Sequence, residues 1–380
     1  MKIKAILWVC ALIQIVPQAN LVCDPTEKMM VSSCVADLRC KPEFMPSHLK
    51  APAMSKDIGA QDSQLLYGEC VLAEPVEGAP QWMSVSVLGQ KAWRNNQWVP
   101  YPGFILKSSL MPVVEFPKYN IVLQNLWTPL FSDMDVKSLV LKDLALGTKL
   151  EARKVNDGWW EVIVDKKIAG YLQFNNAIYL ATEIVRESES FLRDQIVRIA
   201  RLFVGSGTSY VWGGRSPLNP KIDQITGIDC SGLTNLCYLA SGLEIPRDAG
   251  PQRRAANELK NGQDLKKADL IFFANDEAGL RISHVVMYVG NERVVESTGL
   301  GFSSIKDLDD KSINKNGFTV SDLCVREITI KDLIGVDLAE IENGKTISKN
   351  GKRIFLGSYF GPDSKIQNMR DIALGKNVVW

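Results

Sequence analysis

The sequence predicts two small all-β barrels followed by an α+β domain. Length is the first reason, because 380 residues suggest two or three domains of roughly 100–200 residues each. The second reason is a series of short apolar segments, bounded by glycine and proline, over the first half of the chain. The third is a change near residue 183, where apolar residues begin to recur at helical spacing among charges.

The N-terminus has the layout of an export signal. Lys2 and Lys4 precede an apolar run over residues 6–16, and Ala19 is small enough to precede a cleavage point. We therefore predict a secretory signal peptide over residues 1–19, which is too short to be a comfortable membrane span. The mature protein is expected in the periplasm, in the cell envelope or secreted, without stable membrane association.

Charge and residue counts exclude several classes of function. The 44 basic and 43 acidic residues nearly cancel, so charge gives no reason to expect nucleic acid or an anionic membrane as a partner. With two histidines and no Cys-x-x-Cys pair, we expect no metal and no cofactor. Of the eight cysteines, Cys10 leaves with the signal peptide, and the odd number left predicts at least one free thiol. The cysteines between residues 23 and 70 could form disulfides, in a pairing that the sequence does not give.

Residues 31–110 and 119–180 carry the strand pattern of the two barrels. Strands are predicted at 31–38, 64–72, 82–88 and 104–106 in the first barrel, and at 121–126, 149–154, 159–164 and 169–174 in the second. Both runs share a glycine-initiated strand, an aromatic-rich strand and a glycine-containing return, which suggests two copies of one module. Most of the aromatic residues are expected to fill the barrel cores rather than to bind a ligand.

The α+β domain is predicted over residues 188–360. It opens with the helical pattern of residues 183–204, and a second helical run follows Cys230. Apolar strand patterns then occur at residues 282–290, 293–297 and 353–359.

Cys230 is the candidate nucleophile. It stands between a glycine-containing loop and an apolar helical run, where a helix is expected to start. The unpaired backbone N–H groups and the dipole at a helix N-terminus favour a thiolate. The same N–H groups can hold the oxyanion that forms when a thiolate attacks a carbonyl.

His284 is the candidate general base, because an imidazole must take and return the proton. The other histidine, His48, falls in a predicted loop of the first barrel. Glu296 stands twelve residues after His284, so a hairpin in register would place it on the neighbouring strand to orient the ring. A cysteine or a histidine taken singly is more often structural. Together, in an exported chain, they indicate thiol-dependent hydrolysis.

Residues 188–345 resemble the NlpC-type family of papain-like cell-wall peptidases. The matching motifs, in the order of that family, are Tyr210-Val-Trp-Gly-Gly214, Asp229-Cys-Ser-Gly232, Pro246-Arg-Asp248, Gln252, Asp269-Leu270, Ser283-His-Val285 and Tyr288-Val-Gly290. The resemblance implies a papain-like α+β fold with Cys230 as nucleophile and His284 as base. It also implies that Tyr210 lies beside the nucleophile and helps to shape the oxyanion site.

The two predicted barrels resemble tandem bacterial SH3-type domains. With them, the chain is similar to a subgroup that cleaves the γ-D-glutamyl–diamino acid (diaminopimelate) bond of peptidoglycan stem peptides with a free N-terminal L-alanine. The resemblance implies that Glu69 and Tyr101 of the first SH3-type domain close the cleft. It also implies that Asp229 binds the substrate amine, with Ser231 nearby. The expected partners are stem peptides or released muropeptides.

The sequence departs from the family pattern at several positions. Glu296 stands where the family usually has histidine, and Ala249 where the subgroup often has serine. Residues 218–225 lengthen the loop before the nucleophile, and the segment after residue 345 matches nothing assignable. Two other functions stay open at this point. One is a catalytically weak module that binds cell-wall peptides, and the other is an acyltransferase or amidase that uses the same Cys-His dyad.

Overall fold

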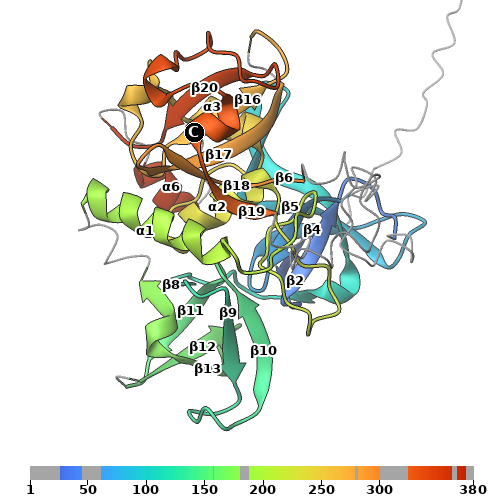
Figure 1. Ribbon diagram of the computed structural model, residues 1–380. Coiled ribbons are helices and arrows are strands. Elements are labelled where there is room, and N and C mark those ends of the chain that lie inside the picture. Colours follow the sequence, from blue (N-terminus) through green and yellow to red (C-terminus); the bar gives the residue numbers. More distant parts are fainter. Residues whose placement is uncertain are drawn as a thin grey trace, which may run out of the picture.

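Three antiparallel sheets and a group of helices make up the described part of this computed structural model (Figure 1). The structure describes residues 26–44, 61–156, 158–179, 188–278, 281–299, 324–361 and 366–373. The predicted signal peptide and His48 lie outside these residues.

The first sheet has the strand order β3-β2-β6-β5-β4-β1-β7. Its strands are β1 (Glu27–Val31), β2 (Val35–Arg39), β3 (Gln61–Leu66), β4 (Cys70–Pro75), β5 (Trp82–Arg94), β6 (Gln97–Leu106) and β7 (Leu110–Pro112). Asn95 and Asn96, with φ of 50° and 60°, form the tight turn of the long β5–β6 hairpin.

The second sheet has the order β10-β9-β13-β12-β11-β8-β14, which repeats the first sheet with every strand number raised by seven. Its strands are β8 (Ile121–Leu123), β9 (Trp127–Phe131), β10 (Val140–Ala145), β11 (Lys149–Lys154), β12 (Trp159–Val164), β13 (Lys167–Gln173) and β14 (Ala177–Tyr179). Gly68 and Gly147, with φ of 85° and 84°, stand at the same turn in the two sheets. The duplication predicted from the sequence is therefore present in the topology.

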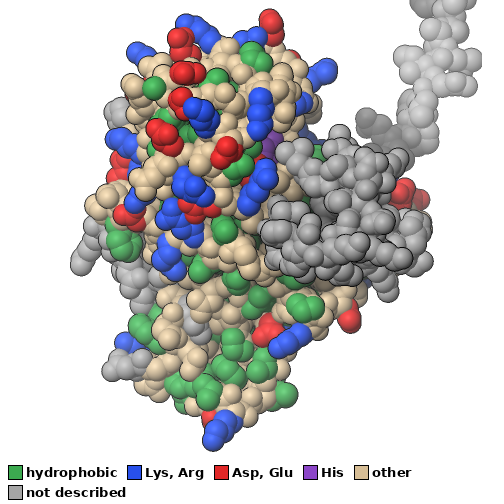
Figure 2. Space-filling model, viewed as in Figure 1, with side chains coloured by type: hydrophobic (Ala, Val, Ile, Leu, Met, Phe, Trp, Pro, Cys, Tyr) green, Lys and Arg blue, Asp and Glu red, His purple; other side chains and the backbone are tan. Residues whose placement is uncertain are grey.

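Several strand predictions were wrong in extent. The predicted strands at 31–38 and 64–72 are each two strands, because a turn at 32–34 divides the first and a reversal at Gly68 divides the second. The sequence reading also missed β9 and β10. Hydrophobic side chains cover much of the visible face of the second sheet (Figure 2). Leu139 and Ile168 are among the exposed apolar residues of this region. Solvent-facing apolar residues weaken the alternation on which strand prediction depends.

The α+β region is built on a third sheet with the order β15-β20-β16-β17-β18-β19. Its strands are β15 (Asn257–Glu258), β16 (Leu270–Ala274), β17 (Ile282–Gly290), β18 (Arg293–Ser297), β19 (Val325–Thr329) and β20 (Arg353–Ser358). The helices are α1 (Glu189–Phe203), α2 (Cys230–Ala240), α3 (Ala249–Ala255), α5 (Ile330–Ile334) and α6 (Ile366–Ala373). Short 3₁₀ turns occur at η2 (Lys107–Ser109), η3 (Phe174–Asn176), η4 (Gly262–Asp264) and η8 (Leu338–Glu340).

One hydrophobic core joins the three sheets. It contains α2 and one side of β17. Leu66 from the first sheet, Val122 from β8 and Leu146, directly after β10, pack against them. In Figure 1, α1 runs between the third sheet and the second, and Arg198 on α1 donates a hydrogen bond to Gln124 at 3.0 Å. The region that carries Cys230 is therefore packed against both N-terminal sheets. None of the described helices has the length and apolarity needed to cross a bilayer.

Candidate active site

Cys230 is the first residue of α2, as the sequence predicted. Asp229 caps the helix, because its side chain accepts a hydrogen bond from the backbone N–H of Gly232 at 2.6 Å. The Cys230 side chain is nearly buried, with 9% of the residue exposed. A sulfur in this position lies at the positive end of the helix dipole, where a thiolate is stabilised.

His284 lies on β17 and Glu296 on β18. His284 Nε2 and Glu296 Oε2 are 2.7 Å apart. Met287 pairs with Val295, so Glu296 is reached diagonally across the hairpin and not directly opposite His284. The twelve-residue spacing therefore predicted the contact correctly, while the simple matched register was wrong.

The charge state of His284 depends on two neighbours. Burial favours the neutral ring, but hydrogen bonds and charge interactions with Cys230 and Glu296 outweigh it and raise the pKa of His284 to about 10. Because Nε2 faces Glu296, Nδ1 is the ring nitrogen left for the thiol. The arrangement favours an imidazolium beside the sulfur, which is the acid needed to protonate a leaving amine.

Tyr210 lies close enough to Cys230 to interact with its charge. Burial, followed by the charges of Cys230 and Asp229, raises the pKa of its phenol, so the hydroxyl keeps its proton and can donate a hydrogen bond. The loop after Tyr210 touches the start of α2 so closely that a Cβ on Gly232 would lie 2.2 Å from the carbonyl oxygen of Gly214. Glycine at these positions allows the loop to approach the helix.

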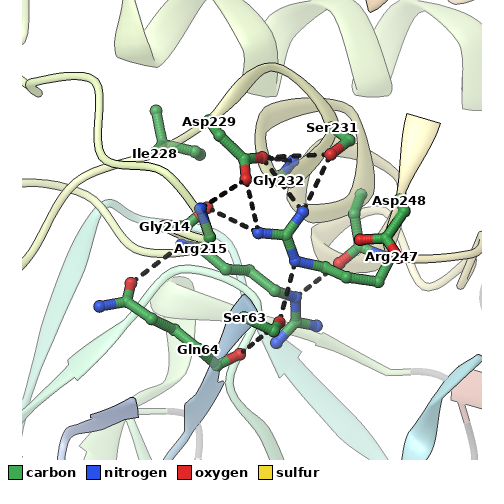
Figure 3. Close-up of polar contacts among 12 residues, drawn as sticks. Ser63, Gln64, Gly214, Arg215, Ile228, Asp229, Ser231, Gly232, Arg247 and Asp248 are labelled. Carbon is green, nitrogen blue, oxygen red and sulfur yellow. Dashed lines mark hydrogen bonds and ion pairs between the residues drawn. The ribbon is translucent and has the colours of Figure 1, made fainter. Parts of the chain in front are cut away.

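Asp229 has partners that the sequence did not predict. Arg247 Nη1 lies 3.1 Å from Oδ1 and Nη2 lies 2.9 Å from Oδ2, and the guanidinium is fully buried (Figure 3). Ser231 Oγ donates to Oδ1 at 3.2 Å and accepts from Arg247 at 3.0 Å. The carboxylate is thus engaged by Arg247 and by the backbone N–H groups of Gly213 and Gly232. This geometry gives Asp229 and Ser231 a role in holding the start of α2.

Tyr101 of β6 contacts Asp248, which follows the nucleophile helix. The phenol hydroxyl lies 3.2 Å and 3.1 Å from the two carboxylate oxygens of Asp248. Burial, with further contributions from Asp229 and Asp62, raises the pKa of Asp248 to about 6 despite the nearby Arg247. Asp248 and Asp62 were not predicted as site residues. The only signal for Asp248 was its place in the Pro-Arg-Asp motif.

Glu69 lies elsewhere. Its carboxylate is 3% exposed and lies 2.9 Å from Arg215 Nη1, and it also accepts a hydrogen bond from the backbone N–H of Leu66. Arg215 in turn binds Asn235 of α2 at 2.6 Å. The structure therefore brings Tyr101 to Asp248 but places Glu69 in a buried cluster behind the nucleophile helix.

Two residues of β3 reach the same region (Figure 3). Ser63 Oγ accepts a hydrogen bond from Arg247 Nε at 2.9 Å. The Gln64 side chain accepts from the backbone N–H of Arg215 at 2.9 Å and donates to the carbonyl of Ile225 at 2.6 Å. The loop that lengthens the segment before Cys230 is thus attached to the first sheet.

Within the described residues, no group of three or more His, Cys, Asp or Glu side chains is arranged to hold a metal ion. The six described cysteines form no disulfide: Cys34, Cys40, Cys70, Cys230, Cys237 and Cys324. Cys230, His284 and Glu296 place a thiol, an imidazole and a carboxylate in sequence at the site.

Comparison with known proteins agrees with this geometry. Residues 207–321 match the model of the NlpC/P60 family. A gamma-D-glutamyl-L-lysine dipeptidyl-peptidase of Bacillus cereus is 28% identical over 62% of this chain and 67% of its own length. Its namesake from Bacillus subtilis is 27% identical over 63% of this chain and 73% of its own length. The fold of an NlpC/P60 family protein from Bacillus cereus covers 88% of this chain and 100% of that chain, with a TM-score of 0.62 at 20% identity.

The matched region includes α2 with Cys230, β17 with His284, and the loop of Tyr210. The strand-rich N-terminal part and the helix-and-sheet part of the chain both lie within the span of the similar fold. The chain therefore carries an NlpC/P60 domain and is homologous to the gamma-D-glutamyl-L-lysine dipeptidyl-peptidases.

Proposed function

We propose that the protein is a cysteine peptidase that hydrolyses the γ-D-glutamyl–diamino acid bond of peptidoglycan stem peptides with a free N-terminal L-alanine. The observation that carries the proposal is the chain of contacts from Cys230 at a helix N-terminus through His284 to Glu296. Cleavage of that bond in such a peptide releases a dipeptide of L-alanine and D-glutamate. This is dipeptidyl-peptidase chemistry, the activity named for the two Bacillus relatives.

In the proposed reaction, the Cys230 thiolate attacks the γ-carbonyl carbon and a sulfur–carbon bond forms. The backbone N–H of Cys230 and the Tyr210 hydroxyl stabilise the oxyanion. The carbon–nitrogen bond then breaks as His284 gives its proton to the leaving amine. Water attacks the thioester, His284 takes a proton from it, and the sulfur–carbon bond breaks to restore the thiolate and imidazolium.

We assign the substrate amine to the Tyr101–Asp248 end of the site. A buried ammonium requires a carboxylate partner. The carboxylates of Asp229 and Glu69 already bind arginine, so they are less suited to this role than the sequence implied. Within the described residues Asp248 forms no direct ion pair, and it is partly exposed. Asp62 contributes a second negative charge nearby.

The proposal extends to the organisation of the chain. The shared strand order supports two SH3-type barrels, over residues 31–110 and 119–180, before a papain-like peptidase domain over residues 188–360. Export by the signal peptide of residues 1–19 would bring the enzyme to its substrate. The intact hydrogen-bonded chain of Cys230, His284 and Glu296 argues against a binding module without activity.

The experiment is mass spectrometry of L-Ala-γ-D-Glu-meso-diaminopimelate after incubation with the mature protein. We expect release of free diaminopimelate, abolished in Cys230→Ala. Cys237→Ala is the matched control, because Cys237 is buried on the same helix, away from its N-terminus. It should retain activity.

An N-acetylated substrate and an L-lysine substrate complete the set. Loss of cleavage on acetylation would support the amine site, whereas equal cleavage of both forms would remove it and leave the peptidase. Comparison of the lysine and diaminopimelate peptides identifies the preferred diamino acid. No cleavage of any peptide by a folded protein would overturn the proposed function.

A further inference from the structure

Glu296 has a second partner, outside the chain from Cys230 to Glu296. β18 pairs with β19 so that Glu296 stands directly opposite Arg326. Arg326 Nε and Nη2 lie 2.8 Å and 2.7 Å from Oε1 of Glu296. The other oxygen, Oε2, lies 2.7 Å from His284 Nε2. Each oxygen of the carboxylate is therefore held by a different basic side chain.

The burial of Glu296 makes the second partner important. Its side chain is fully buried, and burial alone would raise the pKa of the carboxyl. Contacts with His284 and Arg326 outweigh burial and hold the pKa of Glu296 below its usual value. When His284 loses its proton, Arg326 still provides a positive charge beside the carboxylate. The groups that face the pair are thus Cys230 from α2 and Arg326 from β19.

We propose that Arg326 is a positioning residue that turns Oε2 of Glu296 toward His284 and keeps the shared proton on the imidazole. The role rests on the proposed function, because it serves catalysis only if His284 is the acid and base. An oriented, ionised carboxylate fixes the ring so that the other nitrogen points at the thiol. Without Arg326, Oε1 is left buried without its partner, and the proton of the pair is free to move toward Glu296.

The first measurement is a pH titration of His284 by NMR of histidine-labelled protein. The chain has two histidines, so a His48→Gln variant assigns both signals. Arg326 is a positive charge beside the coupled His284–Glu296 pair, so Arg326→Gln should raise the apparent pKa of the pair by about one unit. With diaminopimelate peptide as substrate, kcat should fall roughly tenfold, as for loss of other orienting partners.

Arg293→Gln is the matched control. Arg293 lies on the neighbouring strand with 41% of its side chain exposed, against 39% for Arg326, and it binds Glu327 instead of Glu296. This variant should leave the titration and kcat unchanged. Arg326→Lys keeps the positive charge but cannot contact Glu296 through two nitrogens. In this variant His284 should titrate as in the parent, while kcat should be reduced. It also serves if the glutamine variant does not fold.

A Glu296→Gln background tests the route of the effect. There, Arg326→Gln should shift the titration of His284 much less, because only the through-space charge of Arg326 then acts on the ring. A parent-like titration in Arg326→Gln, or an equally large shift without Glu296, would overturn the proposal. The titration needs no substrate. An inactive parent with the expected shift would therefore count against the proposed peptidase, and an active enzyme without the shift would count against Arg326.

Discussion

Asp248 lies at the end of the site that we assign to the substrate amine, and its carboxyl group changes charge close to neutral pH. Its pKa of about 6 means that the carboxylate is present above this pH and is lost below it. The α-amine of a peptide, with a pKa near 8, stays protonated throughout this range. Asp248 therefore offers its negative charge to the proposed substrate ammonium only on the alkaline side of its titration.

We predict that KM for the free-amine peptide rises as pH falls from 7 to 5, by up to about tenfold for the last unit. Asp248→Asn keeps a hydrogen-bonding partner for Tyr101 but has no charge to titrate. Its KM should be high and flat over the same range. The measurement is KM against pH for both proteins, and a flat parent profile would count against Asp248 as the amine partner.

Individual residues were predictable to different degrees. Cys230 and His284 stand in short local motifs, and Glu296 follows His284 at a spacing that fits a hairpin. The structure places the three in contact. The partners of Asp229 and Glu69 were not predictable, because Arg215 is 146 residues from Glu69 in sequence and Arg247 follows Asp229 only after helix α2. No local pattern tells whether a carboxylate will face a substrate or a buried arginine.

At the scale of the element, the start of α2 depends on contact with the loop before it. Gly232 is helical, where alanine is normally better by about 1 kcal/mol. Here, however, the added methyl group would lie 2.2 Å from the Gly214 carbonyl oxygen, which is backbone and cannot turn away. The ordinary preference of the helix is therefore reversed at this position.

Gly232→Ala should lower the free energy of unfolding by about 1–3 kcal/mol, the usual range for overpacking. It should also slow alkylation of Cys230, because the helix start must shift. Gly250→Ala on α3 is the control, since nothing lies within 4 Å of its added Cβ. This variant should be neutral or up to about 1 kcal/mol more stable. Thermal and denaturant unfolding of both proteins make the comparison, and equal stability would contradict the contact.

The presence of a strand was easier to predict than the residues at which it begins and ends. Turn residues such as Gly68 and the Asn95-Asn96 pair mark reversals of the chain, yet an apolar run that crosses such a turn looks continuous. In the third sheet, β17, β18 and β20 were predicted close to their bounds, whereas β16 and β19 were not predicted. The identical strand order of the first two sheets follows from non-local pairing, which only the weak repeat indicated.

For the whole molecule, Gln64 is a main link between the first sheet and the peptidase region. The side chain is fully buried, and it bonds Arg215, Ser216 and Ile225 across the interface and Asp37 within its own sheet. Loss of such a residue leaves several buried polar groups without partners.

We predict that Gln64→Leu lowers stability by about 3 kcal/mol and reduces kcat, although Gln64 touches no reacting atom. Gln97→Leu on β6 is the control, because Gln97 is exposed and its loss should change stability by less than about 0.5 kcal/mol. Unfolding midpoints and steady-state kinetics give both readouts. An active, fully stable Gln64→Leu protein would show that the interface does not support the site.

The contacts of Ser63 and Gln64 with Arg247 and Arg215 also bear on how such proteins diversify. Gene shuffling can exchange whole domains, provided that they are joined by linkers and fold independently. Here a segment that begins near residue 188 would lose Ser63 and Gln64, which form hydrogen bonds with Arg247 and Arg215 behind Cys230. The N-terminal sheet and the loop before Cys230 are therefore expected to be inherited as a unit, and chimaeras should be joined upstream of β3 if they are to keep a working thiol.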